Sequence, residues 1–253
     1  VFGMPHGPGP PPLKPETMEP QSCSTAGRLE ILRNIPFFAG LSAADLHDIN
    51  RLYVSQGYAP GETIYFAGDP ATRLYVIAAG KVKVIRHSLG GQEVMLDILS
   101  TGECFGNLAV LGRETHLDTA QAQTTTCVLT ISGDDFQTIL LRYPHVALAA
   151  LRITAARLKD AQDMIQQLSA HSAEQRIAAM LLKLSEKGGE PQKDGVLIQM
   201  PLSRQDLADL TGTTPETASR VMSQFRQAKL IRTGRQWVSI LDRQRLLDIL
   251  SCP

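Results

Sequence analysis

The sequence has few cysteines and no long apolar run. Its four cysteines, Cys23, Cys104, Cys127 and Cys252, are widely separated and form no Cys-x-x-Cys pair, so they predict no metal site. No apolar stretch approaches the roughly 18 residues of a membrane span. The first residues are rich in proline and glycine and lack the apolar core of a signal peptide. We therefore expect residues 1–28 to be a disordered tail, and the protein to be cytoplasmic with no membrane partner.

The motifs of common enzymes are also missing. The sequence contains no His-x-His metal spacing, no nucleophile beside a base and no phosphate-binding loop. These absences predict no catalytic residues and no metal ligands, so we do not expect an enzyme.

The chain has no net charge, with 25 basic and 25 acidic residues, but the charge is unevenly distributed. Residues 171–253 hold 12 Lys and Arg against 9 Asp and Glu. From Thr214 to Arg245 there are seven basic residues and only two acids. Such a concentration is what binding to a phosphate backbone requires.

The basic region overlaps a stretch, residues 202–227, whose pattern predicts two short helices. Ser203 can cap the first helix, and an apolar stripe follows between Leu207 and Leu210. Gly212 permits a tight reversal of the backbone. Thr214 can cap the second helix, and Pro215 suits its first position because the missing N–H costs nothing there. This layout is that of a DNA-reading helix-turn-helix, and we expect Ser203 and Thr214 to be among its DNA-binding residues.

The second helix separates into two faces. Its apolar stripe consists of Ala218, Val221, Met222 and Phe225. The opposite face carries Glu216, Thr217, Ser219, Arg220 and Ser223. Arg220 can donate two bonds to guanine, Glu216 can accept from cytosine, and the hydroxyls of Thr217 and Ser219 can bond to bases or phosphate. The alternative is an ordinary amphipathic helix whose charged face meets water.

Residues 230–241 resemble two short strands around a Gly-Arg turn. Arg232 and Arg235 near its tip could touch phosphate, which would make the hairpin a wing. A plain solvated hairpin is the alternative.

The front half predicts a β-barrel or sandwich. Glycines punctuate residues 54–131 at short intervals, and between them lie strand-like runs at 63–66, 74–77, 82–85, 94–99 and 127–131. Helical patterns flank this region at about residues 28–50 and 133–168.

The second helical pattern carries a possible coiled-coil seam. Its residues follow alternating spacings of four and three: Ala147, Leu151, Thr154, Leu158, Ala161, Ile165 and Leu168. The narrow seam favours a homodimer, in which two recognition helices about 34 Å apart would read a palindrome. A helix packed only on its own barrel is the alternative.

Together these motifs resemble the CRP/FNR family of bacterial transcription regulators over nearly all of residues 30–248. The resemblance is carried by the helix-turn-helix and by residues 60–64, 67–70, 74–84 and 102–106, which read PGETI, AGDP, LYVIAAGKVKV and GECFG. It implies an α+β fold with a double-stranded β-helix (jelly-roll) sensor barrel at 29–141, a long dimerisation helix at 142–170 and a winged helix-turn-helix at 171–248. It also implies a transcription activator that binds palindromic double-stranded promoter DNA and contacts RNA polymerase.

The recognition helix resembles the FNR branch of that family. Glu216-Thr217-Ala218-Ser219-Arg220 matches its Glu-x-x-Ser-Arg pattern, which implies a half-site like TTGAT. The branch that reads TGTGA has an arginine where this chain has Pro215. Arg204 matches a family residue that contacts phosphate.

The effector pocket implied by the resemblance contains Gly106, Asn107, Leu108, Asp118 and Thr119. In relatives that bind cyclic AMP, a Glu holds the ribose and an Arg-Ser pair holds the phosphate. Here Asn107 replaces the Glu and Asp118-Thr119 replace the pair. A carboxylate repels phosphate, so the substitutions disfavour cyclic AMP, although Arg113 could substitute for the missing arginine.

Other effectors known in the family fit less well. An iron–sulfur cluster needs clustered N-terminal cysteines, and only Cys23 lies there; haem needs ligands, and the six histidines show no paired spacing. The effector therefore stays unknown, with another small molecule or no effector at all both open. A different class of function also stays open, in which a ligand-sensing module uses its helix-turn-helix for protein contact.

Overall fold

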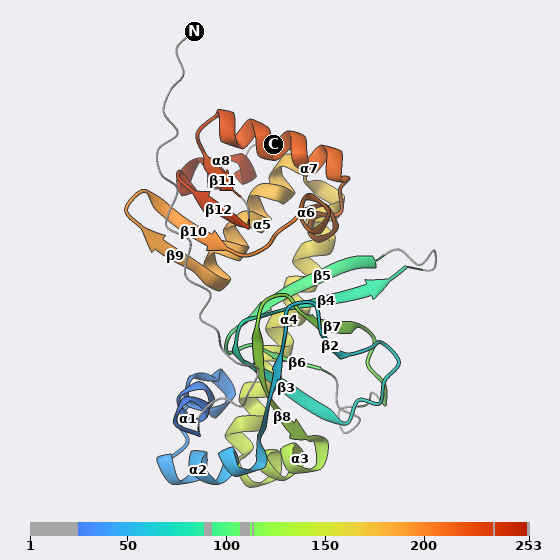
Figure 1. Ribbon diagram of the computed structural model, residues 1–253, viewed down its shortest axis with the longest axis vertical. Coiled ribbons are helices and arrows are strands. Elements are labelled where there is room, and N and C mark those ends of the chain that lie inside the picture. The colour runs from blue at the N-terminus through green and yellow to red at the C-terminus, as the bar shows by residue number, and fades with distance from the viewer. Residues whose placement is uncertain (1–24, 89–92, 107–111, 113, 235, 252–253) are drawn as a thin grey trace.

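The computed structural model describes residues 25–88, 93–106, 112, 114–234 and 236–251. They form a barrel, a C-terminal head and one long helix that runs beside the barrel as far as the head (Figure 1). Asn107, Leu108, Arg113 and Arg235, which the sequence singled out, lie outside the described residues.

The barrel is built from two four-stranded antiparallel sheets, as the glycine-punctuated strands predicted. One sheet has the order β1 (Val54–Tyr58), β8 (Thr126–Ser132), β3 (Arg73–Ala79), β6 (Cys104–Phe105). The other has the order β2 (Thr63–Tyr65), β7 (Thr119–Ala122), β4 (Lys81–His87), β5 (Glu93–Ser100). The short strands β1, β6 and β7 were not predicted.

Burial along the strands follows from their place in the sheets. Strand β8 pairs with a neighbour on each side and is buried at six of its seven positions. A continuous apolar run of this kind is expected for a strand covered on both faces. The barrel core gathers large side chains that include Tyr65, Tyr75, Ile77 and Phe105.

Helices cover one end of the barrel, and proline breaks both of the expected helical patterns. The N-terminal pattern forms α1 (Thr25–Asn34), a 3-10 turn η1 (Pro36–Phe38) and α2 (Ala43–Leu52). Helix α1 thus begins inside the segment expected to be tail. The second pattern forms α3 (Gly133–Arg142) and α4 (Pro144–Ala170), bent by 115°. Pro144 causes this break because it disfavours the helical conformation of the preceding residue.

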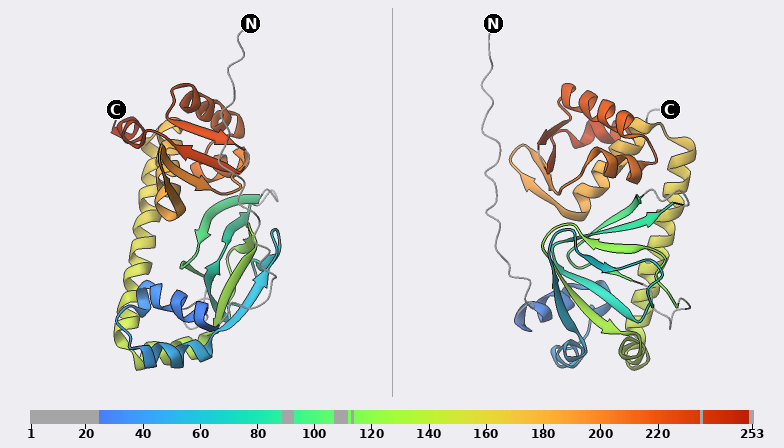
Figure 2. Two further views of the ribbon diagram at one scale, coloured as in Figure 1. Left: turned by 60° about the vertical axis from the view of Figure 1, so that its left-hand side comes forward. Right: turned by 45° about the vertical axis from the view of Figure 1, so that its right-hand side comes forward.

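Helix α4 has 27 residues, which gives a length of about 40 Å. Figure 2 shows it running along one side of the barrel to the base of the head. Among the described residues, no single helix is both long and apolar enough to cross a membrane.

The head combines four helices with one antiparallel sheet. Its helices are α5 (Ala173–Gly188), α6 (Arg204–Thr211), α7 (Pro215–Gln227) and α8 (Arg243–Ser251). Its strands lie in the order β11 (Ile231–Gly234), β12 (Trp237–Ile240), β10 (Gly195–Gln199), β9 (Gly189–Gln192). The predicted C-terminal hairpin is confirmed as β11–β12, and the hairpin β9–β10 extends it into a sheet that the sequence did not predict.

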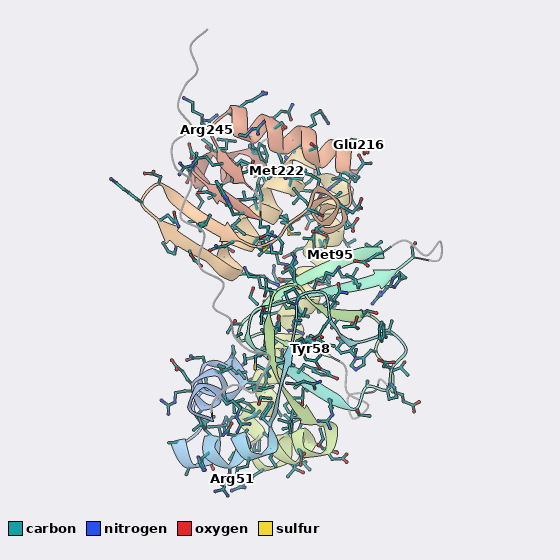
Figure 3. The ribbon with its side chains drawn as sticks, in the orientation of Figure 1. Arg51, Tyr58, Met95, Glu216, Met222 and Arg245 are labelled. Atoms are coloured by element: carbon teal, nitrogen blue, oxygen red, sulfur yellow. The ribbon has the colours of Figure 1, made fainter. Side chains whose placement is uncertain are left out.

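The head is packed on the β4–β5 hairpin of the barrel. Ile85, Met95 and Ile98 from these strands belong to the same buried cluster as the apolar side chains of the head. Met95 lies where β5 meets the head (Figure 3). Two long side chains of the barrel also donate to head carbonyls: Lys81 Nζ to Gln199 O at 2.7 Å and Gln123 Nε2 to Pro201 O at 2.9 Å.

Candidate nucleic-acid interface

Helices α6 and α7 form the predicted helix-turn-helix, and each begins at its expected cap. The Ser203 hydroxyl accepts from the Asp206 amide at 3.0 Å, and the Asp206 carboxylate accepts from the Ser203 amide at 2.8 Å. This reciprocal pair satisfies two backbone donors at the start of α6. Helix α6 ends at Gly212 in the left-handed conformation, with φ 59° and ψ 45°. Thr214 then caps α7 by accepting from the Thr217 amide at 3.3 Å.

Helix α7 presents the two faces that its sequence predicted. Ala218, Val221, Met222 and Phe225 are buried in the head. Glu216, Ser219 and Arg220 are exposed, whereas Thr217 is half-buried and its hydroxyl lies 3.3 Å from the Thr214 hydroxyl. Figure 3 shows Glu216 at the end of α7 on the outer edge of the head, away from the barrel. The exposed face offers an arginine donor and a carboxylate acceptor to a partner.

Two observations describe the charge on this surface. The amide of Glu216 and the Thr214 side chain donate to the Glu216 carboxylate and lower its pKa. Glu216 is therefore a charged acceptor at neutral pH. Half-buried Arg204 has its pKa lowered by burial and by the neighbouring guanidinium of Arg226. A cation of α6 and a cation of α7 thus lie near each other.

Arg226 and Arg245 are basic residues that the sequence did not assign to the site. Arg226 is exposed near the end of α7, and Arg245 donates through Nη1 to Ala228 O, the carbonyl of the α7 C-cap, at 3.3 Å. In the sequence, these two arginines were marked only by their place in the basic stretch from Thr214 to Arg245. Spacing alone could not tell which of these cations face the same way as Arg220.

The hairpin β11–β12 stands beside the helices, as expected of a wing. Arg232 is exposed and lies 3.9 Å from Asp194 in the β9–β10 turn. An exposed pair at that distance contributes little to stability, so Arg232 stays available to another anion. Arg235, the second predicted phosphate contact, lies outside the described residues.

An apolar row runs along the exposed side of α4. Of the seven predicted seam residues, Ala147 is half-buried. The other six are exposed in the single chain: Leu151, Thr154, Leu158, Ala161, Ile165 and Leu168. Leu151, Leu158 and Ile165 are exposed by 65%, 60% and 65%, respectively. A row of exposed large apolar side chains at helical spacing marks an interaction surface.

A cavity of about 390 Å³ lies between the barrel, α4 and the head. Gly106 and Asp118, from the predicted effector pocket, line it. Glycine is required at 106 because φ is +90° and a Cβ would lie 2.7 Å from Tyr75 Cδ2. Thr119 is buried in β7, and its hydroxyl accepts from the Ala67 amide at 3.0 Å, so it is committed to the barrel. Asn107 and Leu108 lie outside the described residues.

The charged groups of the cavity are mostly paired with one another. Lys187 lies 3.1 Å from Asp97 and 3.2 Å from Glu103. Lys183 pairs with Asp160, and Arg157 donates to the Cys104 carbonyl.

Asp118 differs from the other acids of the cavity. It accepts from the Tyr65 hydroxyl at 3.2 Å, and no lysine or arginine forms an ion pair with it among the described residues. Burial and the nearby Asp118 carboxylate raise the pKa of Tyr65, so this hydroxyl stays a donor. A ligand that reached Asp118 would meet negative charge.

Comparisons with known proteins agree with this arrangement. The family model for a cyclic nucleotide-binding domain matches residues 55–143, and that for a Crp-like helix-turn-helix domain matches residues 175–249. A cyclic AMP receptor protein from Thermus thermophilus is 32% identical over 86% of this chain and 98% of its own length. A global nitrogen regulator from Synechococcus elongatus is 30% identical over 72% of this chain and 83% of its own length.

Among solved structures, FixK2 from Bradyrhizobium japonicum superposes with a TM-score of 0.71 at 24% identity. The match covers 79% of this chain and 98% of FixK2. This similarity shows the shared fold.

Proposed function

The chain belongs to the CRP/FNR family, and we propose from this premise that it is a homodimer whose two α7 helices read a palindromic promoter site. It is a DNA-binding transcription regulator.

The observation that carries the proposal is the exposed face of α7. Arg220 and Glu216 point away from the packed side of the helix, where Val221 and Phe225 anchor it. We assign Arg220 to a guanine and Glu216 to a cytosine amino group, with Ser219 beside them. A half-site like TTGAT contains a guanine on one strand and its cytosine on the other, which suits this pair.

Contacts to the phosphates are assigned to cations around that face. The charge of Arg226 contributes to lowering the pKa of Arg204, so the two lie near each other, and Arg232 lies on the wing. A phosphate between two guanidiniums would relieve their repulsion. Such contacts position the protein but do not select bases.

Assembly is assigned to the exposed row on α4. Burying Leu151, Leu158 and Ile165 against the same residues of a second copy removes apolar surface that water now covers. The resulting dimer would carry two heads at one end. We further assign the regulator to the cytoplasm and expect RNA polymerase as a partner.

The cavity beside Asp118 is assigned to an effector. Residues of the barrel, α4 and the head line the cavity, so a ligand bound there would contact all three parts of the protein. Asp118 disfavours a phosphate at that position. A neutral or cationic small molecule therefore suits the described part of the cavity better than a cyclic nucleotide.

One experiment tests the proposed function. Purified protein selects bound sequences from random duplex DNA, and affinity for the enriched site is then measured from 50 to 200 mM salt. We expect an inverted repeat to be enriched and the affinity to fall steeply as salt is raised. Failure to enrich any inverted repeat would contradict palindromic reading. Weak binding that does not change with salt would instead indicate that the helix-turn-helix contacts protein.

A further inference from the structure

Arg176 occupies the junction between the long helix and the head. It lies in the first turns of α5, which follows the end of α4 after only two residues. Its guanidinium donates to four carbonyl oxygens from two different helices and the turns that follow them. On the α4 side these are Leu168 O at 3.5 Å and His171 O at 2.9 Å. On the α6 side they are Thr211 O at 2.7 Å and Gly212 O at 3.1 Å.

The acceptors explain why an arginine suits this position. Carbonyls at the end of a helix have no partner within the helix and carry the negative end of its dipole. Arg176 meets two such ends at once, one from α4 and one from α6. Its planar fork holds donors at fixed angles, so the two helix ends cannot turn independently while the bonds persist.

A second contact joins the same two elements. Leu168, in the last turn of α4, packs on Gly212, where an added Cβ would lie 2.4 Å from Leu168 Cδ2. Gly212 also has φ +59°, which disfavours any other residue. Leu168 is 44% exposed and belongs to the row that we assign to the dimer. One side chain therefore contacts both the turn of the helix-turn-helix and the surface that faces the second copy.

The position of α7 depends on this junction. Gly212 ends α6, and α7 begins three residues later at Pro215. Holding the carbonyls of Thr211 and Gly212 therefore holds the direction in which α7 leaves the turn. Because α4 carries the dimer row, the bonds of Arg176 relate each recognition helix to the dimer axis.

We infer that Arg176 is a positioning residue that sets the spacing between the two recognition helices of the dimer, and this inference rests on the proposed function. One additional base pair between half-sites moves them apart by about 3.4 Å and rotates them by roughly 34°. A rigid junction should therefore reject operators whose spacer is one base pair too long or too short. A loose junction should tolerate them.

The test measures affinity for a series of palindromes that differ only in spacer length. For the unaltered protein we expect one spacer to be preferred at least tenfold over its neighbours. Arg176→Lys keeps the charge but cannot bridge four carbonyls with one ammonium group. We expect this variant to reduce the preference to about threefold or less, while its affinity for a single half-site and its dimer dissociation constant stay within twofold of the unaltered protein.

Controls separate positioning from a merely structural role. Arg243→Met removes an arginine of α8 that bonds to Ser185 and Glu186. These two residues lie on α5, as Arg176 does, but away from the junction, so this variant should keep the spacer preference intact. Gly212→Ala strains the junction from the other side and should flatten the preference as Arg176→Lys does, which provides a second variant if Arg176→Lys does not fold.

Three outcomes are decisive. A flattened preference with unchanged half-site affinity supports the inference. A sharp preference retained by both junction variants would overturn it and leave palindromic reading intact. No spacer preference in the unaltered protein would overturn the proposed function, and the inference with it.

Discussion

The backbone amide of Met95 in the barrel donates to the carboxylate of Asp209 in the first helix of the helix-turn-helix, at 3.3 Å. This bond crosses from the barrel to the head that carries the helix-turn-helix. The side chain of Met95 is buried in the core of the head, so a polar and an apolar contact meet at one residue. A displacement of strand β5 would therefore be transmitted directly to helix α6.

Asp209→Ala should loosen this contact. Loss of one hydrogen bond to a carboxylate costs about 1.5 kcal/mol or more, which should speed hydrogen exchange at the Met95 amide at least about tenfold. Mass spectrometry or NMR can follow that amide. Asp248→Ala is a matched control, because Asp248 accepts from Gln244 just as Asp209 accepts from Gln205, both four residues earlier. If the exchange rate of the Met95 amide rises equally in both variants, the Met95–Asp209 bond does not stabilise the packing of the head on the barrel.

Arg220→Ala and Arg226→Ala should separate base reading from phosphate binding. Arg220→Ala should remove about 1–3 kcal/mol of discrimination at one base pair, or roughly 5- to 150-fold. Arg226→Ala should weaken binding to all sequences alike and reduce the salt slope by about 1. Fluorescence anisotropy with the selected site and with single-base variants measures both effects. Equal losses on every sequence for Arg220→Ala would make Arg220 a phosphate contact.

Leu158→Lys should separate the two copies without unfolding either. Leu158 is 60% exposed in the single chain, so the substitution costs the folded protomer little. In a dimer it would remove an apolar contact of about 1.5–3 kcal/mol from each copy, which weakens association at least 100-fold. Sedimentation velocity at a series of protein concentrations measures the dimer dissociation constant. Leu141→Lys replaces a leucine that is 77% exposed on α3, outside the seam, and should stay dimeric. A Leu158→Lys protein that remains as dimeric as its control would place the interface elsewhere.

Cyclic AMP should not stabilise the protein. A ligand at 100 times its dissociation constant adds about 2.7 kcal/mol, which would raise the melting temperature by several degrees. We expect a change below 1 °C at about 1 mM nucleotide, because Asp118 opposes the phosphate. Asp118→Asn removes the charge while keeping the shape, so any response should be larger in that variant. A rise of several degrees in the unaltered protein would show that other residues hold the phosphate despite Asp118.

Local signals predicted the reading head well. Ser203 and Thr214 cap the helices as expected, and the stripe from Ala218 to Phe225 is buried as expected, because caps and amphipathic spacing depend on neighbours within a turn or two. The bend before Pro144 was missed because an apolar pattern can continue across a break in the backbone. The β9–β10 hairpin was missed because its outer strand, Gly189–Gln192, is largely exposed and has no apolar alternation.

The sequence by itself determined the parts: a barrel of short strands, a long helix with an apolar row, and a capped helix-turn-helix with a charged outer face. These features depend on residues that are close along the chain, so their spacing is enough to reveal them. Only the tertiary structure decided how the parts are joined. The bond from Met95 to Asp209 spans 114 residues, and Arg176 meets carbonyls 35 and 36 residues away. Because one partner in each of these bonds is a backbone atom, which every residue possesses, no side-chain pattern could have identified the pairs.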